Sequence, residues 1–591
     1  MTGARRLINQ LVKRNVTDIF GYPGGAILPV LNELHQHKKI KYYLSRTEQG
    51  AGFMADGYAK ISGKMGVVMT TSGPGALNIM TCLQNALSDG TPMIALTGQV
   101  STAVLGTDAF QEANIIDVSK TCTKWNSMIR DGGLIENTVD AAVDAIFDKR
   151  HGPVLLDLPK NIMSESVKSY MVERSWRPGD WSVEPLIKST VCVDDILKMI
   201  ESAKRPVILA GQGVLQAGPK AINHLRMLSM IYNIPVTTTL MGLGVFNEKK
   251  KLSLKMVGMH GSFYANRAVQ NCDLLLNFGS RFDDRIIGLP SKFASFAKIV
   301  HVDISAKNIN KVIKTPYYIN DSCAPVLAEL ISKSVDSAST ASDFIKNRRY
   351  NNDQWITSID GWKAVPFSYP KHTGILQGRE VIATLNTLMY SDAWANTHFT
   401  IVADVGAHQM WAAQFIDYNY YRVRFLTSGG LGSMGYALPA SIGAKIALTS
   451  SNNKVICICG DGGFTMSFVE LLTAIENKVN IKVLIINNSY QLMVKMWQDK
   501  FYDKRYVGVK MNNPPFELVC REMGCKTMKI DGVKDIDKKL QEFLEYEDGP
   551  IIANVITNQS EAVLPMVSPG KALDDMILFE SEDKLEGDAP C

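Results

Sequence analysis

Short hydrophobic runs alternate with glycine turns and amphipathic stretches along most of the chain. In the first 165 residues, runs such as Gly66–Thr70 and Met93–Thr97 each end near a glycine, and Gly66–Thr70 leads into a helix-type pattern. A repeated order of strand, turn and helix predicts parallel strands, because parallel neighbours need a crossover long enough to span the sheet. We therefore expect a doubly wound parallel sheet in residues 1–165.

The same alternation restarts twice further along the chain. Residues 191–340 and residues 375–560 each carry several short apolar runs that end at Gly, Asp or Asn. Residues 166–190 and 332–368 lack a regular period and are interpreted as linkers. Residues 561–591 show no strand signal and end in an acidic stretch, so we expect a C-terminal tail there. The predicted fold class is α/β, with three doubly wound parallel-sheet domains.

The most informative stretch is Val455–Gln498. It opens with the apolar run Val455–Cys459, continues through a Gly-Asp-Gly-Gly turn and an amphipathic helix pattern, and reaches a second apolar run at Ile481–Ile486. A strand–helix–strand unit makes the two strands parallel. Asp461 and Asn488 then both lie just past the carboxyl ends of strands, where open α/β sheets bind ligands.

The chemistry of these two residues suits a cation that is shared with a phosphate group. One carboxylate and one amide oxygen make an incomplete cage for Mg²⁺, which commonly takes its other ligands from a bound diphosphate and water. Each half alone is equally well read as an ordinary turn and an ordinary Asn-Asn loop. The pair, separated by the 24 residues from Gly463 to Ile486, is typical of the thiamine-diphosphate signature GDG…NN. Tyr490 is expected to add a backbone carbonyl to the metal.

Composition narrows the class of protein. The chain has 591 residues, of which 46% are hydrophobic and 20% charged, as in soluble globular proteins with a large core. A net charge of +5 without a dense basic block argues against a nucleic-acid partner, and no apolar run is long enough to cross a membrane. The ten cysteines form no CxxC pair, which favours a reducing compartment without a zinc site. Because the first residues already predict a helix, we expect no targeting peptide within this sequence.

A series of motifs in fixed order covers nearly the whole chain. They are FGYPGGAILPV, TEQGAGFMADGYAK, TSGPGALN, GTDAFQEA, CTKW, GPVLLDLPKN, GMHG, SRFDDR, SGGLGSMGYALPA, GDGGF and LPMV. The motifs and their order resemble those of the catalytic subunits of acetohydroxyacid synthases, also called acetolactate synthases, and the motif sequences are most similar to the fungal forms. The resemblance implies a pyrimidine-binding first domain, an FAD-binding central domain and a diphosphate-binding third domain. It also implies a homodimer or higher oligomer, with active sites between the first domain of one chain and the third domain of another.

The resemblance further implies an activity. Such enzymes decarboxylate pyruvate on thiamine diphosphate and join the hydroxyethyl unit to a second pyruvate or to 2-ketobutyrate, the first common step of branched-chain amino-acid synthesis. Thiamine diphosphate and Mg²⁺ take part, and FAD is mainly structural in this family. A mitochondrial location is implied for fungal forms, and a separate regulatory subunit remains open. The sequence does not decide between the two acceptors, or between dimer and tetramer.

Three residues would act at the reaction centre. Glu48 begins a predicted helix, where a carboxylate is favoured by the helix dipole, and it matches the family's catalytic glutamate, which shares a proton with the cofactor's aminopyrimidine ring. Gly25 lies in a turn that would face the developing oxyanion with a backbone N–H group. Gln111 would direct its side-chain amide to the same place.

The resemblance assigns the remaining positions to three groups. The substrate channel would be lined by Phe110, Lys160, Met259, Asp284, Arg285 and Trp497, with Arg285 holding the carboxylate of the second keto acid. Thiamine diphosphate would contact Tyr22, Pro74, Asn78, Val405, Gly406, His408, Gln409, Gly432, Met434, Gly462, Gly463, Met493 and Val494, and the metal would take Asp461, Asn488 and Tyr490. FAD would contact Arg150, Gly211, Gly213, Gly258, His260, Gly279, Arg281 and Asp303. Any one of these side chains alone is more often structural, and the GxG at 211–213 is a weak nucleotide signal.

Several positions depart from the family pattern. They are Thr47 and Phe53 in place of His, Ser101 in place of Pro, Ala407 in place of Gln, and Leu492 in place of Gly. Two explanations follow: a working synthase with a remodelled, inhibitor-resistant channel, or a paralogue with reduced or altered activity. We expect the first, because the catalytic set is retained. The alternatives are another thiamine-diphosphate enzyme, such as a pyruvate oxidase or decarboxylase, and a non-catalytic partner subunit.

Overall fold

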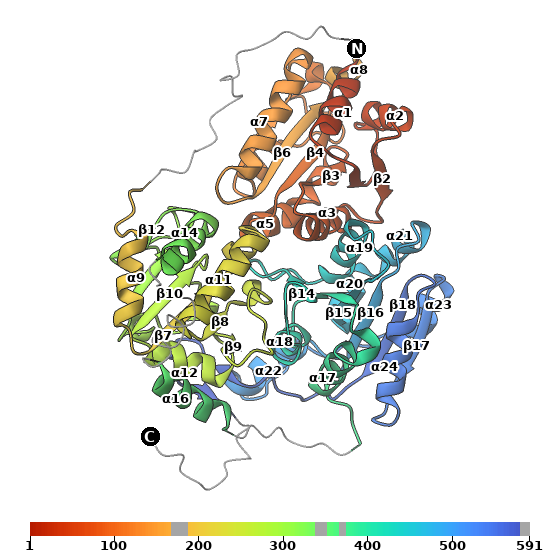
Figure 1. Cartoon of the computed structure of the whole chain (residues 1–591). Coiled ribbons are helices and arrows are strands. Elements are labelled where there is room, and N and C mark those ends of the chain that lie inside the picture. The colour runs from red at the N-terminus through yellow and green to blue at the C-terminus, as the bar shows by residue number, and fades with distance from the viewer. Residues whose placement is uncertain (167–186, 337–351, 366–373, 579–591) are drawn as a thin grey trace.

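Three six-stranded parallel sheets form the framework of the chain. The computed structural model describes residues 1–166, 187–336, 352–365 and 374–578. The strand orders are β2-β1-β3-β4-β6-β5, β12-β11-β10-β7-β8-β9 and β14-β13-β15-β16-β18-β17. Helices cover the sheets, with the first domain above and the second and third side by side below it (Figure 1). The predicted fold class is confirmed.

The first domain is built on buried strands of the kind that the apolar runs predict. β3, β4 and β6 are buried along their whole length, as parallel strands covered by helices on both faces are. The strands are β1 (Asp18–Gly21), β2 (Lys41–Leu44), β3 (Gly66–Thr70), β4 (Met93–Gln99), β5 (Trp125–Met128) and β6 (Pro153–Pro159). The helices are α1 (Gly3–Lys13), α2 (Leu28–Gln36), α3 (Glu48–Ser62), α4 (Pro74–Leu77), α5 (Met80–Asp89), α6 (Ile115–Ser119), α7 (Ile135–Phe147) and α8 (Lys160–Ser164).

The second domain continues beyond its predicted end. Its strands are β7 (Pro206–Ala210), β8 (Val236–Thr238), β9 (Ser253–Met256), β10 (Leu274–Phe278), β11 (Lys298–Val302) and β12 (Tyr317–Ile319). Its helices are α9 (Val193–Ser202), α10 (Gln212–Gln216), α11 (Pro219–Tyr232), α12 (Phe263–Asn271), α13 (Asp284–Ile287), α14 (Cys323–Asp336) and α16 (Asp353–Lys363). The linker prediction for 332–368 is wrong at α16, because Trp355 and Ile359 are buried in the core of this domain. The prediction is also wrong at residues 332–336, which form the end of α14. Residues 337–351, 366–368 and 167–186 lie outside the described part of the chain.

The third domain carries the Val455–Gln498 stretch. Its strands are β13 (His398–Ala403), β14 (Val423–Thr427), β15 (Asn453–Gly460), β16 (Lys482–Asn487), β17 (Lys526–Ile530) and β18 (Ile551–Ile556). Its helices are α17 (Gly378–Met389), α18 (Ala407–Phe415), α19 (Ala437–Ala447), α20 (Asp461–Ser467), α21 (Leu471–Glu476), α22 (Leu492–Phe501), α23 (Phe516–Glu522) and α24 (Ile536–Glu545). β15 and β16 are parallel neighbours, and Gly460 opposite Ile486 is the last residue pair between them. The GDG and NN ends therefore meet, although two short helices joined by a 3₁₀ turn replace the single predicted helix.

The expectation of a tail without strands is wrong for its first part. β19 (Met566–Val567) and β20 (Met576–Ile577) form an antiparallel pair, and Leu573 between them is fully buried. The Val567 N–H donates to the Met259 carbonyl at 2.8 Å, so this pair is fastened to the second domain. Its alternating apolar residues are too few to give a pattern in the sequence. Residues 579–591 lie outside the described part of the chain.

The first and third domains meet through a very close crossing of α3 on α19. A methyl group at Gly57 would overlap the Ala440 carbonyl, and one at Gly443 would overlap the Met54 carbonyl. Only residues without a side chain let the two backbones approach this closely. The helix that begins at Glu48 is thus fixed on the third domain of its own chain.

Buried Asp157 makes the stability of the first domain depend on pH. Burial raises its pKa to about 7, against hydrogen bonds from Thr97 and Gln99 that favour the carboxylate. The unfolded chain loses this proton near pH 3.8 and the folded chain near pH 7. Stability from this group is therefore complete below about pH 4 and lost as the pH rises through about 7, by on the order of 4 kcal/mol.

Asp157→Asn is expected to flatten this pH dependence and to raise the melting temperature at pH 8. Thermal unfolding of both proteins between pH 5 and pH 8 measures the effect. Asp575→Asn, which changes an exposed carboxyl, should leave the profile as it is. A variant with the wild-type slope between pH 5 and 8 would contradict the prediction.

Candidate active site

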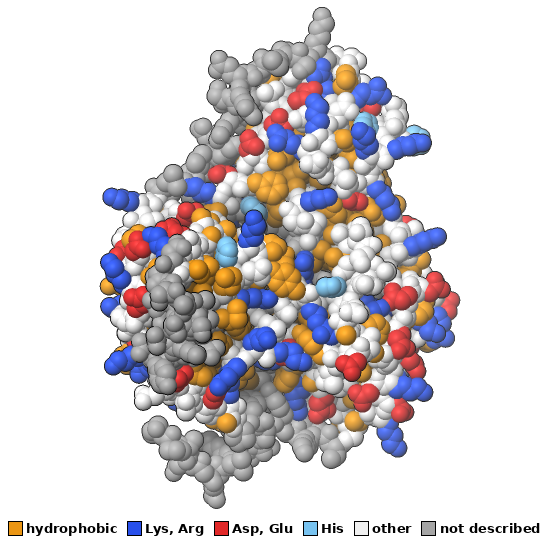
Figure 2. All heavy atoms as spheres, in the orientation of Figure 1, with side chains coloured by type: hydrophobic (Ala, Val, Ile, Leu, Met, Phe, Trp, Pro, Cys, Tyr) orange, Lys and Arg blue, Asp and Glu red, His pale blue; other side chains and the backbone are white. Residues whose placement is uncertain are grey.

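A cavity of about 760 Å³ lies between the second and third domains. It brings together most of the predicted positions of these two domains. The residues predicted to bind substrate that line it are Met259, Asp284, Arg285 and Trp497, and the predicted metal ligands are Asp461, Asn488 and Tyr490. The residues predicted to bind thiamine diphosphate that line it are Val405, Gly406, His408, Gln409, Gly432, Met434, Gly462, Gly463, Met493 and Val494. The residues predicted to bind FAD that line it are Arg150, Gly213, His260, Gly279, Arg281 and Asp303. Hydrophobic side chains gather on the surface where the three domains meet (Figure 2).

One corner of the cavity, called the metal corner, holds the predicted metal ligands Asp461, Asn488 and Tyr490 and has one carboxylate among them. Asp461 begins α20, is 2% exposed, and accepts a hydrogen bond from the Gly462 N–H at 3.1 Å. Burial raises the pKa of Asp461, and hydrogen bonds from Asn513 and nearby backbone N–H groups oppose the rise. The Asn488 side chain accepts from the Tyr490 N–H at 3.0 Å, which fixes the loop at the end of β16.

These groups fit a magnesium ion that is shared with a second ligand. In the described part of the chain, no group of three or more His, Cys, Asp or Glu side chains is placed to hold a metal. A cation between Asp461 and Asn488 therefore needs further oxygen ligands from a bound molecule. Mg²⁺ with a diphosphate has this requirement.

The side chains of His408 and Gln409 are engaged within the protein. The Gly460 N–H donates to His408 Nε2 at 3.2 Å, and burial lowers the pKa of this histidine to about 3, so the ring is neutral. Gln409 donates its amide to the Thr427 hydroxyl at 2.7 Å. The Gln409 N–H already donates to the Gly406 carbonyl at 3.1 Å, so what this segment offers an anion is the positive N-terminal end of α18.

A cationic side chain stands at the mouth of the cavity. Arg285 is about two-thirds exposed, with its Nη1 atom 3.4 Å from the Met259 sulfur and its Nε atom 3.5 Å from Asp284. The Met259 N–H donates to the Arg285 carbonyl at 2.7 Å, which holds the two residues side by side. Trp497, on α22, lines the same cavity. A guanidinium beside apolar walls suits a small carboxylic acid.

The glycines assigned to FAD act largely in packing. A methyl group at Gly213 would lie 2.7 Å from the Gly279 Cα, so these turns cross in close contact. Gly211 and Gly258 are not among the residues that line the cavity. Arg150 and Arg281 do line it, and both also donate to the Ser88 carbonyl, at 2.7 and 3.0 Å. Arg281 thereby ties the second domain to the first at this end of the cavity, whereas Arg150 itself belongs to the first domain.

Apart from Arg150, the predicted residues of the first domain form a separate cluster that does not line the cavity. Asn78 donates to the Glu48 carboxylate at 3.1 Å, and a methyl group at Gly73 would lie 2.8 Å from the Gln111 carbonyl. Phe110 is 88% exposed. The remaining members are exposed side chains and turns at the ends of the strands: Tyr22, Gly25, Pro74 and Lys160. One chain thus presents the two halves of the predicted site on different surfaces.

Glu470 is a functional candidate that sequence reasoning missed. This buried residue of the third domain accepts from the N–H groups of Arg46 and Thr47 at 3.0 and 2.9 Å, and from the hydroxyls of Thr47 and Thr473, both at 2.9 Å. The two backbone N–H groups can only donate and favour the carboxylate form, whereas burial raises the pKa of Glu470. Glu470 thereby fixes the chain just before Glu48. Sequence patterns describe local structure, so they could not show that Glu470 contacts Arg46 and Thr47, which lie more than 400 residues away in the sequence.

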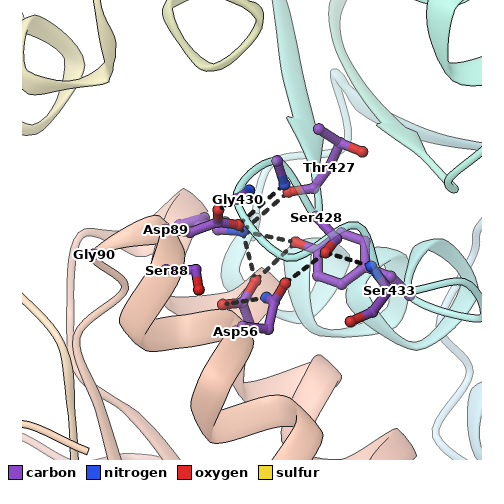
Figure 3. A network of polar contacts seen from close by, with 12 residues as sticks. Asp56, Ser88, Asp89, Gly90, Thr427, Ser428, Gly430 and Ser433 are labelled. Atoms are coloured by element: carbon purple, nitrogen blue, oxygen red, sulfur yellow. Dashed lines mark hydrogen bonds and ion pairs between the residues drawn. The ribbon is translucent and has the colours of Figure 1, made fainter. Parts of the chain in front are cut away.

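A buried charged network joins the same two domains (Figure 3). The Lys60 ammonium lies 2.9 Å from Asp56 and 2.8 Å from Asp89, and all three side chains are almost fully buried. Asp89 also accepts from the Gly430 N–H at 2.7 Å. The Ser428 hydroxyl accepts from the Ser433 N–H at 2.8 Å. The network therefore holds the glycine turn that lines the cavity.

Positions that depart from the family pattern have ordinary local roles. The Thr47 hydroxyl accepts from the Gly50 N–H at 2.9 Å and caps α3, as threonine does well. Phe53 is buried edge-on against a tyrosine, with ring centroids 5.3 Å apart. The Ser101 hydroxyl caps a 3₁₀ turn. Ala407 and Leu492 are buried and line the cavity, so the residue types at these two positions shape its wall.

Three family models match the chain. They are the N-terminal TPP binding domain, the central domain and the C-terminal TPP binding domain of thiamine pyrophosphate enzymes, over residues 1–118, 193–330 and 404–555. The mitochondrial acetolactate synthase of Schizosaccharomyces pombe is 40% identical over 98% of this chain and 87% of its own length. The mitochondrial catalytic subunit of Saccharomyces cerevisiae is 39% identical over 98% of this chain and 84% of its own length.

The chain belongs to the acetolactate synthase family. The large subunit of Corynebacterium glutamicum is 38% identical over 98% of this chain and 90% of its own length, so the likeness extends beyond fungi. Membership in the acetolactate synthases confirms the predicted family and makes this chain a thiamine-diphosphate-dependent enzyme. No helix in the described residues has the length and apolar character to cross a membrane.

Proposed function

We propose that this acetolactate synthase decarboxylates pyruvate and joins the two-carbon unit to a second 2-keto acid, with Mg²⁺ and FAD bound beside thiamine diphosphate. The observation that carries the proposal is that one cavity is lined by Asp461 and Asn488 and also by Arg285 and Trp497. A decarboxylase has no second acid to bind, whereas a ligase needs a cation for that carboxylate. Pyruvate and 2-ketobutyrate both fit this requirement.

Each group of residues has a separate task in the mechanism. Asp461, Asn488 and the Tyr490 carbonyl would hold Mg²⁺, and the glycine turns would hold the diphosphate. Thiamine diphosphate supplies the carbon nucleophile and stabilises the charge left by decarboxylation. Glu48 holds and releases a proton at the aminopyrimidine ring, while Gly25 and Gln111 offer N–H groups to the developing oxyanion. Arg285 orients the second acid for bond formation.

FAD would occupy the end of the cavity near Arg150, Arg281 and Asp303. The two guanidiniums suit phosphate groups, and Asp303 suits a hydroxyl-bearing ribose. Asp303 is buried and already accepts from the Ser305 N–H at 2.8 Å, so its carboxylate is fixed in place. We assign FAD a structural task there.

The activity is tested by product analysis with purified protein, thiamine diphosphate, Mg²⁺ and FAD. Acetolactate from pyruvate alone supports the proposal, and 2-aceto-2-hydroxybutyrate on adding 2-ketobutyrate shows that the second acceptor is used. Acetaldehyde or acetyl phosphate as the sole product would overturn it in favour of a decarboxylase or an oxidase. No product under saturating cofactors would favour an inactive paralogue. The same assays on a fungal relative that is active provide the reference.

We also propose that two copies of the chain complete each active site. The support is the separation of the Glu48 cluster from the cavity that holds the metal corner. A second copy that places its first-domain cluster over this cavity would join the two halves, and a twofold dimer would make two such sites. A mitochondrial location is proposed from the names of the fungal relatives.

Mixing two inactive variants tests this arrangement. Glu48→Gln and Asp461→Ala are each expected to be inactive, and refolding or co-expressing them together should restore about a quarter of the wild-type activity. Half of randomly formed dimers are mixed, and each mixed dimer has one intact site. Gel filtration of each variant alone checks that it still assembles. An inactive mixture that contains mixed dimers would place both residues in the same chain's site.

A further inference from the structure

Asn513 lies against the metal corner, outside any helix or strand. Its side-chain Nδ2 donates to the Asp461 carboxylate at 2.6 Å and to the Asn487 side-chain oxygen at 3.1 Å. Asp461 is one proposed metal ligand, and Asn487 directly precedes Asn488, the other. A single amide group therefore contacts both strand ends that supply the metal site.

The direction of this amide is fixed by a chain of hydrogen bonds that ends on a carboxylate. Asn487 donates to the Asn554 side-chain oxygen at 3.0 Å, and Asn554 donates to Glu517 at 2.8 Å. A carboxylate only accepts, so Asn554 presents its nitrogen to Glu517 and its oxygen to Asn487. Asn487 then presents its oxygen to Asn513. Asn513 is left with both N–H bonds directed to Asn487 and Asp461, which removes the usual ambiguity of amide orientation.

The middle of the network is sheltered from water, and the two residues at its ends, Asn513 and Glu517, are half-buried. Asp461, Asn487 and Asn554 are 2%, 5% and 3% exposed. A buried amide or carboxylate that loses its partner is costly, so each member keeps the next in place. The network crosses from β15 to β16 and β18, which are neighbouring strands in the sheet order.

The segment that carries Asn513 is also fastened to the loop after β16. The Gln491 N–H donates to the Val509 carbonyl at 2.7 Å, and the Met511 N–H donates to the Ser489 carbonyl at 2.8 Å. The loop between them carries Tyr490, whose carbonyl is a proposed metal ligand. The segment that carries Asn513 is thus held against the loop after β16 by two backbone hydrogen bonds, and this places Asn513 next to Asp461.

We propose that Asn513 is a positioning residue for the metal centre, oriented by Asn487, Asn554 and Glu517. Its N–H occupies one oxygen of Asp461 and leaves the carboxylate turned toward the cavity that it lines. Partners that hydrogen-bond a ligating carboxylate in this way typically change metal affinity 10–100-fold when they are removed. The inference rests on the proposed function, because the cation in question is the Mg²⁺ of that proposal.

The test is a Mg²⁺ titration of thiamine-diphosphate binding, followed by calorimetry or tryptophan fluorescence. Asn513→Ala is expected to weaken the apparent Mg²⁺ affinity about 10–100-fold, and saturating Mg²⁺ should restore cofactor binding. Glu517→Ala should weaken it in the same direction by less, because the amide of Asn513 remains but its orientation is no longer fixed. Asn512→Ala changes an exposed neighbour of the same type and should match the wild type.

The outcomes separate this inference from the proposed function. Wild-type protein that binds thiamine diphosphate without any dependence on Mg²⁺ would refute the metal proposal itself. Wild-type Mg²⁺ affinity in Asn513→Ala would overturn the positioning role alone. A loss of binding that saturating Mg²⁺ does not restore, or a lower melting temperature of the cofactor-free variant, would assign Asn513 a general structural role instead.

Discussion

Glu48→Gln is expected to lower the rate of acetolactate formation by about 10²–10⁴-fold. The glutamine side chain has nearly the same shape and can still accept the hydrogen bond that Asn78 donates to Glu48. It cannot take up and release a proton, and that is the task proposed for this carboxylate. The initial rate with saturating pyruvate and cofactors measures the effect.

Cofactor affinity distinguishes a lost proton transfer from a damaged fold. Thiamine diphosphate should bind Glu48→Gln with an affinity close to that of the wild type, since the diphosphate and metal groups belong to the third domain. Glu329→Gln, a charge change on an exposed residue of α14, should retain full activity. A Glu48→Gln variant with more than a tenth of the wild-type rate would remove Glu48 from the mechanism.

Lys60→Met is expected to destabilise the contact between the first and third domains by about 3–5 kcal/mol. Burial alone would lower the pKa of Lys60, and the carboxylates of Asp56 and Asp89 outweigh this, so its pKa stands well above the ordinary value. Removing the ammonium leaves two buried carboxylates without their counter-ion. The midpoint of urea unfolding, followed by far-ultraviolet circular dichroism, measures the loss.

Two further variants show whether charge is the cause. Lys333→Met removes a half-buried ammonium that also lies between two carboxylates, Asp194 and Glu329, but these two are exposed to solvent, so its effect should be small. Adding Asp89→Asn to Lys60→Met should recover part of the loss, because one of the unpaired charges is gone. Equal midpoints for Lys60→Met and the wild type would show that the network contributes nothing to stability.

The sequence pattern predicted that Asp461 and Asn488 lie close together because the signal for each residue is local. Asp461 and Asn488 each follow an apolar run, and the strand–helix–strand rule places the ends of β15 and β16 side by side. Asn554 could not be found in this way. It reaches Asn487 only because β18 lies next to β16 in the sheet while β17 lies beyond it, and hydrophobic periodicity carries no information on strand order.

Contacts between domains were also invisible to the sequence pattern. The sequence of α3 predicts an ordinary helix, but it does not predict that this helix contacts α19 or that the chain before it contacts Glu470. The helix α16 was missed for a different reason: its apolar positions are interrupted by Ser, Asp and Gly, and only two tryptophans and two isoleucines give it a buried side. Tertiary packing, rather than local preference, makes that segment a helix.

The close crossing of α3 on α19 at glycines separates the parts of the molecule that tolerate substitution from those that do not. Substitutions that widen or narrow the proposed acceptor pocket can be made at Met259, on a domain that takes no part in this crossing, while Arg285 is kept for the carboxylate. Changes to α3 or α19 have no such freedom, since any added side chain at Gly57 or Gly443 displaces a helix that carries Glu48. A library for new acceptor acids is therefore best confined to the second domain and to α22, with these two helices left untouched.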